Sequence, residues 1–166
     1  MGSYKKYSKE NQKLMAVWAL GCAERVLPLF EAASQTDNRP QKALEVGRQW
    51  VMTGVFVMSV IRKASLDAHS AAKDVKENDA ACLAAHAAGQ AVATAHVPQH
   101  AYGSSYYALK AIAAAYPQNA KRKVGDELEW QIQALPEHLR QEIGDRIIVD
   151  DKNRKLRISI DKAEGL

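Results

Sequence analysis

The chain has 166 residues, of which 47% are hydrophobic and 25% charged, and its formal net charge is +4. That length suffices for one domain with a substantial core, and that composition excludes a disordered chain. The longest apolar run, residues 55–58, is too short to cross a bilayer, and the lysine-rich start lacks the apolar stretch of a secretion signal. We therefore expect a cytoplasmic protein without a membrane partner.

Two helices separated by a loop are expected first. Ser8 is a good N-cap for a helix whose apolar residues recur at helical spacing. Pro28 should kink or end this helix, because an internal proline removes a backbone hydrogen bond. After the loop 34–38, a second helix begins with Pro40 in its first turn and stops at Gly54.

A third helix is predicted from Ser59 to the charged run 73–78, and a fourth from Asp79. The alanine-rich pattern of the fourth continues to Tyr116, with a kink or break expected at Pro98.

Four polar side chains would share one side of this long helix. At about 100° per residue they fall within an arc of roughly 80°. They are His86, His96, His100 and Tyr107. Small alanines around them should let neighbouring helices approach closely, so the stripe predicts either a site or a well-satisfied polar core.

Residues 118–125 predict an exposed basic connection, followed by short helices from Asp126 and from Pro136. The remaining segment, 146–162, has β-branched residues on both sides of an Asp/Lys/Asn turn, which is typical of a β-hairpin. A lone hairpin is marginal in water, so it should dock on the helices or on a second copy of the chain. The second arrangement would give a homodimer through the hairpin.

These elements predict an all-α fold. We expect an irregular array of about five to seven helices in antiparallel hairpins over residues 8–145, with the β-hairpin 146–162 appended to the same domain. The basic residues gather at the termini and in the connections 121–123 and 152–157. A nucleic-acid partner would require a basic stripe along one helix or a recognisable motif, and the sequence has neither.

Five separated blocks of sequence carry a resemblance to a known family. They are residues 22–30 (CAERVLPLF), 37–50 with DNRP at their start, Ala68-His69, 93–101 (ATAHVPQHA) and 130–140. In this order and spacing, the chain resembles the immunity-five-like family of bacterial immunity proteins from about residue 14 to residue 143. The resemblance implies an all-helical fold and a protein toxin as the partner to be neutralised. The basic N-terminus and the hairpin lie outside the family's pattern.

Opposite charges lie close in sequence where the first two helices meet: Glu24 with Arg25, Asp37 with Arg39, and Glu45 with Arg48. They predict either ion pairs that hold the loop or one side of a charged cleft completed by histidines. The complete candidate set for binding is Glu24, Arg25, Asp37, Arg39, His69, His96, His100 and Tyr107.

Two functional hypotheses follow. We favour a non-enzymatic protein that binds its toxin partner without a cofactor, through an exposed cluster for which Tyr4, Tyr7, Tyr102 and Tyr106 are candidates. The alternative is a metal- or small-ligand-binding protein or an enzyme. Its metal ligands would be His69, His96 and His100, because His96 and His100 have the i, i+4 spacing of zinc ligands. Pro98 between them argues against this site.

Overall fold

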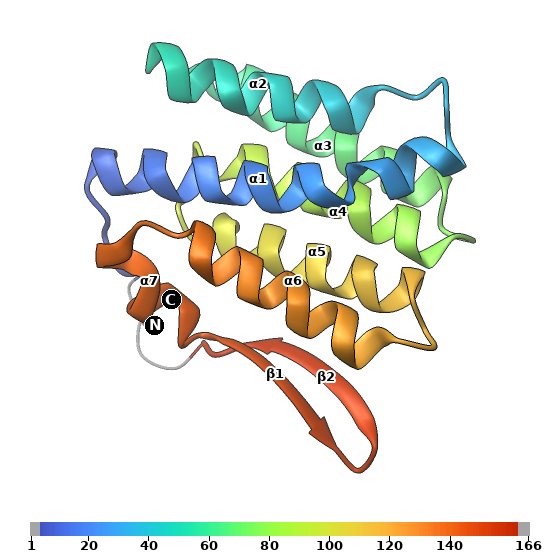
Figure 1. Cartoon of the computed structure of the whole chain (residues 1–166). Helices are drawn as coiled ribbons and strands as arrows, with labels where there is room; N and C mark the ends of the chain where they lie inside the picture. Colours follow the sequence, from blue (N-terminus) through green and yellow to red (C-terminus); the bar gives the residue numbers. More distant parts are fainter. Residues whose placement is uncertain (1–3, 163–166) are drawn as a thin grey trace.

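The computed structural model describes residues 4–162, and in them seven helices precede one β-hairpin (Figure 1). The helices are α1 (Lys9–Ala33), α2 (Arg39–Thr53), α3 (Met58–Asp74), α4 (Asp79–Ala93), α5 (His100–Ala115), α6 (Ala120–Ala134) and α7 (Glu137–Gly144). The strands are β1 (Ile147–Lys152) and β2 (Lys155–Ile160). The predicted fold class, all-α with a small C-terminal hairpin, is confirmed.

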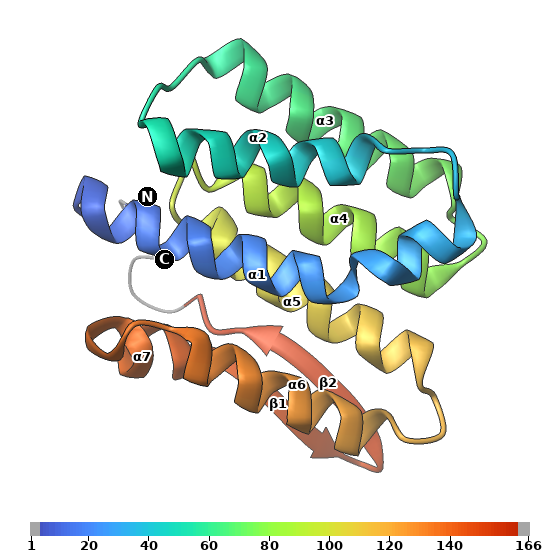
Figure 2. The ribbon, with the colours of Figure 1, turned by 45° about the horizontal axis from the view of Figure 1, so that its top comes forward.

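Six of the seven described helices pack in three layers of two, and the short α7 follows α6. Figure 1 shows α2 with α3, then α1 with α4, then α5 with α6, and the hairpin lies beyond the last layer. The turned view in Figure 2 shows the same order. α4 packs against α1, α2, α3 and α5, so it is the central helix of the fold.

The alanines of α4 explain its central position. A run of them is at most 1% exposed: Ala81, Ala84, Ala85, Ala87, Ala88 and Ala91. Side chains this small let several helices approach one helix while the interior stays closely packed. α3 comes close to α4 at Gly89, where an added Cβ would lie 2.7 Å from Nε2 of His69.

Several helix boundaries follow the predicted local signals. The Ser8 side chain accepts a hydrogen bond from the Asn11 N–H and caps α1. Gly54 ends α2 in the left-handed conformation, with φ of 69°, which glycine adopts without a steric penalty. Pro28 does not end α1, which continues to Ala33.

The long fourth helix breaks at the expected proline and reverses direction. Residues 94–99 form a turn that contains Pro98, and α5 then runs back antiparallel along α4. The proline ring disfavours helical angles at the preceding residue and supplies no N–H to continue the helix. His86 therefore lies on α4, His96 in the turn, and His100 and Tyr107 on α5. The predicted stripe of four side chains on one helix is wrong.

The predicted basic connection 118–125 is also wrong in its extent. α6 begins at Ala120 and not at Asp126, so the basic residues 121–123 lie in its first turns. Cations are unfavourable at the positive end of a helix dipole, so three basic residues give no sequence signal for a helix start here. Lys123 lies over the ring of Tyr116, with its Nζ 4.9 Å from the ring centroid.

The hairpin docks on the helices. β1 and β2 pair antiparallel from Ile147 opposite Ile160 to Lys152 opposite Lys155. Asn153 and Arg154 form the two-residue turn, and both have positive φ, as a type I′ turn requires. Leu156, Ile158 and Ile160 are half-buried and pack on the core, and β2 contacts α5.

Candidate functional site

Two histidines face each other where α3 packs on α4. The Nδ1 atoms of His69 and His86 lie 2.7 Å apart, and their ring centroids are 4.9 Å apart. One nitrogen must donate and the other accept, so the two neutral rings hold different tautomers. On its other side, the His86 ring stacks on Tyr107 of α5 with centroids 5.2 Å apart.

A third histidine lies close to this pair. His100, in the first turn of α5, donates from Nδ1 to Oε1 of Gln90 on α4 over 2.7 Å. We call His69, His86, Gln90, His100 and Tyr107 the histidine cluster. The α4–α5 turn creates it, because the reversal brings residues 86 and 90 opposite residues 107 and 100.

The surroundings of the histidine cluster keep its imidazoles neutral. Burial lowers the pKa of His69 to about 4, and the neighbouring His86, His100 and Lys73 act in the same direction. Burial is also the main cause that lowers the pKa of His86, with Lys73 second. It likewise lowers the pKa of His100, with His96 second. Every cause opposes protonation, so these rings carry no charge at neutral pH.

His96 lies outside the histidine cluster. It is exposed in the α4–α5 turn, and its ring stacks near Phe56 with centroids 6.4 Å apart. In residues 4–162, no three His, Cys, Asp or Glu side chains are grouped where they could share a metal ion. His69, His96 and His100, the alternative metal ligands, are therefore not gathered into one such group.

Two of the charged candidates, Glu24 and Arg25, form ion pairs with other helices and not with each other. Arg25 donates two hydrogen bonds to the buried carboxylate of Glu127 on α6, at 2.8 and 3.0 Å. Its guanidinium carbon also lies 4.1 Å from the ring centroid of Trp130. Glu24 pairs with Arg48 of α2. The two adjacent residues thus fasten α1 to two different helices.

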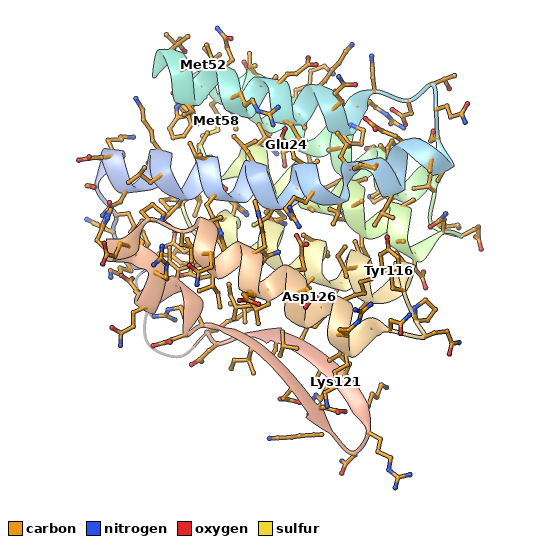
Figure 3. The ribbon with its side chains drawn as sticks, in the orientation of Figure 1. Glu24, Met52, Met58, Tyr116, Lys121 and Asp126 are labelled. Carbon is orange, nitrogen blue, oxygen red and sulfur yellow. The ribbon has the colours of Figure 1, made fainter. Side chains whose placement is uncertain are left out.

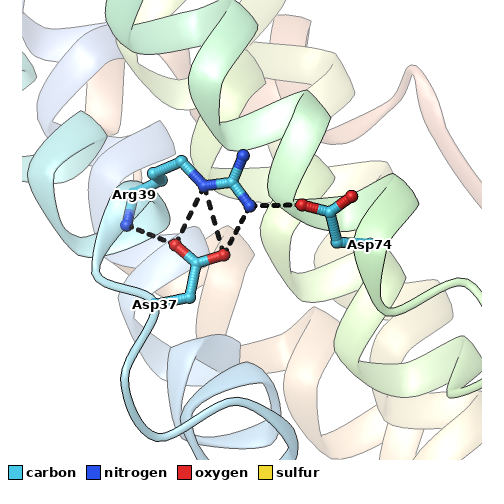
Figure 4. Close-up of polar contacts among 3 residues, drawn as sticks. All are labelled: Asp37, Arg39 and Asp74. Atoms are coloured by element: carbon cyan, nitrogen blue, oxygen red, sulfur yellow. Dashed lines mark hydrogen bonds and ion pairs between the residues drawn. The ribbon is translucent and has the colours of Figure 1, made fainter.

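The loop between α1 and α2 is held by one arginine. Arg39 donates to both carboxylate oxygens of Asp37, and its Nη2 also lies 2.6 Å from Oδ2 of Asp74 at the end of α3 (Figure 4). Hydrogen bonding from Arg39 lowers the pKa of Asp37. The pairing of Asp37 with Arg39 therefore agrees with the expected ion pair that holds the loop.

The structure thus divides the candidate residues among separate places. His69, His100 and Tyr107 belong to the histidine cluster, and His96 lies in the adjoining turn. Glu24, Arg25, Asp37 and Arg39 are engaged in ion pairs with Arg48, Glu127 and Asp74 and with each other. Among the described residues, no hydrogen bond or ion pair joins these charged side chains to the histidines.

A groove of about 470 Å³ lies beside the histidine cluster, between α5 and the hairpin. Its lining includes Gln90, Tyr102, Tyr106 and Tyr107 from the helices and Ile158 and Ile160 from β2. The phenol of Tyr7, another candidate anchor, donates to Glu142 over 2.8 Å. Tyr4 is exposed, but Tyr7 and Tyr106 are half-buried and Tyr102 is buried, so of the four predicted anchors only Tyr4 is largely open to a partner.

An exposed apolar surface lies elsewhere, around the connection from α2 to α3. Its members are between 43% and 79% exposed: Val17, Met52, Val55, Phe56, Val57, Met58 and Val60. We call these residues the α2–α3 apolar surface. Figure 3 shows two of them, Met52 and Met58, at the same end of the molecule, opposite Tyr116 and Lys121.

Three hollows flank the α2–α3 apolar surface. One of about 340 Å³ lies between α2 and α3 and is lined by Trp50, Val55, Val57 and Val60 among others. A second, also about 340 Å³, is lined by Met58, Ile61, Arg62, Ala93 and His96. The third, about 230 Å³, lies between α1 and α2 and includes Val17 and Met52. The surface therefore offers both projecting side chains and depressions.

The set of predicted site residues missed the α2–α3 apolar surface, although the sequence holds a signal for it. Residues 55–58 are four consecutive large apolar residues directly after a glycine that ends a helix. Connections run over the protein surface and are normally polar, so an apolar connection is unusual. Residues 55–58 are treated above only as a membrane span, for which they are too short, and so are not considered there as an exposed apolar surface.

In the described part of the chain, no helix combines the length and the apolar character needed to cross a membrane.

Residues 5–138 match the family model described as "Imm-5 like putative immunity protein". The match covers α1 to α6 and the start of α7, and the hairpin lies beyond it. No curated protein and no solved structure matches the chain. As its five sequence blocks predict, the chain belongs to the Imm-5 like immunity protein family.

Proposed function

We propose that this protein neutralises a bacterial toxin by binding it as a stoichiometric partner, without a catalytic step. Membership of the immunity protein family supports the general role. The observation that carries the proposal is the α2–α3 apolar surface. Monomeric proteins rarely expose contiguous apolar patches of more than a few hundred Å², and such patches mark sites where another molecule docks.

Burial of this surface would supply the binding energy. Met52 is 79% exposed and Val55 67% exposed. Fully burying a side chain of this kind stabilises a complex by about 1.5–3 kcal/mol. A few such side chains at the centre of an interface can carry most of its affinity. No reacting group is needed for a partner to be captured and occluded in this way.

The Nδ1 atoms of the three histidines in the histidine cluster are hydrogen-bonded within the fold. His69 and His86 hydrogen-bond each other, and His100 hydrogen-bonds Gln90. These bonds join α3, α4 and α5, which favours a structural role for the cluster in a protein that works by binding. We also place this binding in the cytoplasm, which the free thiols of Cys22 and Cys82 support. A homodimer through the hairpin stays a prediction.

The test is a titration against candidate toxins encoded by neighbouring genes. Co-expression with the active toxin should restore bacterial growth, and the purified protein should abolish toxin activity at an equimolar ratio. A catalytic antidote would instead inactivate many toxin molecules per molecule of protein. Inhibition far below equimolar amounts, or no protection in cells, would contradict the proposed function.

A second candidate function is small-ligand binding, favoured by the groove between α5 and the hairpin. Its mixture of tyrosine rings, aliphatic side chains and the Gln90 amide resembles the lining of ligand pockets. Native mass spectrometry of the protein purified from bacterial cytoplasm should then show a bound small molecule. The Tyr106→Ala variant should lose it. A wild-type mass equal to that of the bare chain would count against this second function.

A further inference from the structure

We propose that the α2–α3 apolar surface is the face that docks the toxin, and that the toxin covers it with an apolar patch edged by carboxylates. This inference rests on the proposed function and adds the location of the interface and the chemistry of the partner's surface.

The exposed apolar residues of the surface come from three helices and from the connection between two of them. The surface runs from Val17 on α1 across Met52 at the end of α2, through the connection, to Val60 on α3. Hollows of about 340, 340 and 230 Å³ flank it. A partner can therefore bury the projecting Met and Val side chains and insert its own apolar side chains beside them, which is the arrangement found at binding hot spots.

The charged residues that border the α2–α3 apolar surface, which we call its rim, indicate which charges the partner should carry. Residues 46–66 contain Arg48, Arg62 and Lys63 but no Asp or Glu. Arg48 pairs with Glu24, and Lys63 pairs with Asp67. Arg48 and Lys63 are thus compensated, which leaves Arg62 as the cation of this stretch without a paired carboxylate among the described residues.

Lys13 of α1 is a second such cation at the rim. Within residues 4–162, no carboxylate forms an ion pair with Lys13 or Arg62. Lys13 reaches the end of α2, where its Nζ lies 3.3 Å from the position of a Cβ added to Gly54. Arg62 lines the hollow beside Met58. Two uncompensated cations at an apolar face complement acidic groups on the partner, which speed association and orient the docked complex.

Other occupants fit this surface less well. In a two-fold dimer, the same patch meets itself, so the positive rim would face a positive rim. An anionic membrane typically selects clusters of about four to eight cations, whereas among the described residues only Lys13 and Arg62 are left without a paired carboxylate at this rim. A separate protein with an acidic rim satisfies both the apolar and the charged parts of the surface.

The first experiment removes apolar contact. We expect the double variant Met52→Asp/Val55→Asp to bind the candidate toxin from the neighbouring genes, in catalytically inactivated form, at least about 30-fold more weakly than the wild type, measured by titration calorimetry. Both side chains are mostly exposed, so circular dichroism and the melting temperature should change little. The control Tyr116→Asp/Ile148→Asp adds the same charge at exposed apolar residues outside the surface and should bind like the wild type.

The second experiment reverses the charge at the rim. Arg62→Glu should slow association with the same toxin about tenfold at low salt, and the difference should shrink as salt is added. Arg122→Glu changes the net charge equally but lies on α6, outside the rim, so it should leave the association rate close to that of the wild type.

The outcomes separate the inference from the proposed function. A wild type that does not bind the toxin overturns the proposed function and this inference with it. A wild type that binds, together with apolar and charge variants that bind equally well, overturns only the inference. Two other results would also overturn the inference. One is that the wild type sediments as a dimer and Met52→Asp/Val55→Asp sediments as a monomer. The other is that the wild type floats with phosphatidylglycerol vesicles and the same variant does not.

Discussion

His69 and His86 share a hydrogen bond between Nδ1 atoms 2.7 Å apart, and this bond joins α3 to α4. Two protonated rings could not keep this contact, because two N–H groups would point at each other. Lys73 lies close enough to oppose the charged form of both rings, and His100 adds to this effect at His69. The contact therefore makes folding sensitive to pH.

We expect stability to fall as the pH drops from 6.5 towards 4. The pKa of His69 is about 4 in the folded protein against an ordinary value of 6.5. Between these values the unfolded chain binds more protons, so the free energy of unfolding rises with pH and is fully present only above pH 6.5. The loss between pH 7 and pH 4 should be about 2 kcal/mol for a half-buried ring. Urea denaturation across this range measures it.

The matched variant for this prediction is His69→Gln/His86→Gln, which removes the titrating pair. Its stability should depend less on pH between 4 and 6.5 than that of the wild type. Carboxylates such as Asp37, whose pKa is lowered by Arg39, titrate in both proteins and cancel in the comparison. If the free energy of unfolding changed with pH in parallel for the two proteins, the histidine pair would contribute nothing to the pH dependence of stability.

Gly89→Ala should destabilise the protein by about 1–2 kcal/mol, because the new Cβ would lie 2.7–2.9 Å from atoms of the His69 ring. In the His69→Ala background, where that ring is gone, the same substitution should cost almost nothing. Gly125→Ala is the control, since a Cβ there meets no atom within 4 Å, and it should stabilise α6 by about 0.5–1 kcal/mol. Thermal unfolding of the four variants tests the prediction.

Arg25→Met should cost about 2 kcal/mol in unfolding free energy, because it leaves the Glu127 carboxylate buried without its two hydrogen bonds. The Glu127 side chain is only 7% exposed, so water cannot replace the lost partner. Adding Glu127→Gln to Arg25→Met should recover part of the loss by removing the buried charge. Guanidinium denaturation measures the free energy of unfolding of both variants. A double variant no more stable than Arg25→Met alone would show that the unpaired Glu127 carboxylate is not the cause of the loss.

Asp37→Asn and Asp74→Asn should lower the free energy of unfolding by different amounts, although both carboxylates contact Arg39. Asp37 accepts from the Arg39 guanidinium and from its backbone N–H, so its loss should cost about 1 kcal/mol. The Asp74 side chain is 66% exposed, and the loss there should be about 0.3 kcal/mol. Equal melting temperatures for the two variants would contradict this ranking.

Local signals in the sequence predicted most of the elements. Ser8 caps α1, Gly54 ends α2, and α7 follows Pro136. The residues around 153–154 predicted the hairpin turn. Such features depend on backbone preferences and side-chain periodicity within a few residues, which the sequence contains directly. The sequence blocks around Pro28, Arg39 and His96 likewise predicted the immunity protein family.

Which side chains contact one another within the chain depended on the tertiary structure. Periodicity placed His86 and Tyr107 on one helix, whereas the reversal at Pro98 brings them together from two helices. Residue spacing paired Glu24 with Arg25, yet each side chain finds its partner on another helix.

The exposure of residues 52–60 was also decided by packing, because an apolar run has the same sequence whether helices cover it or not. By itself, the sequence determined most of the helices, the Ser8 cap, the hairpin and the family, all of which local spacing and residue type encode. Only the tertiary structure decided which side chains meet and which apolar residues stay open to a partner, because those outcomes depend on contacts between residues far apart in the chain.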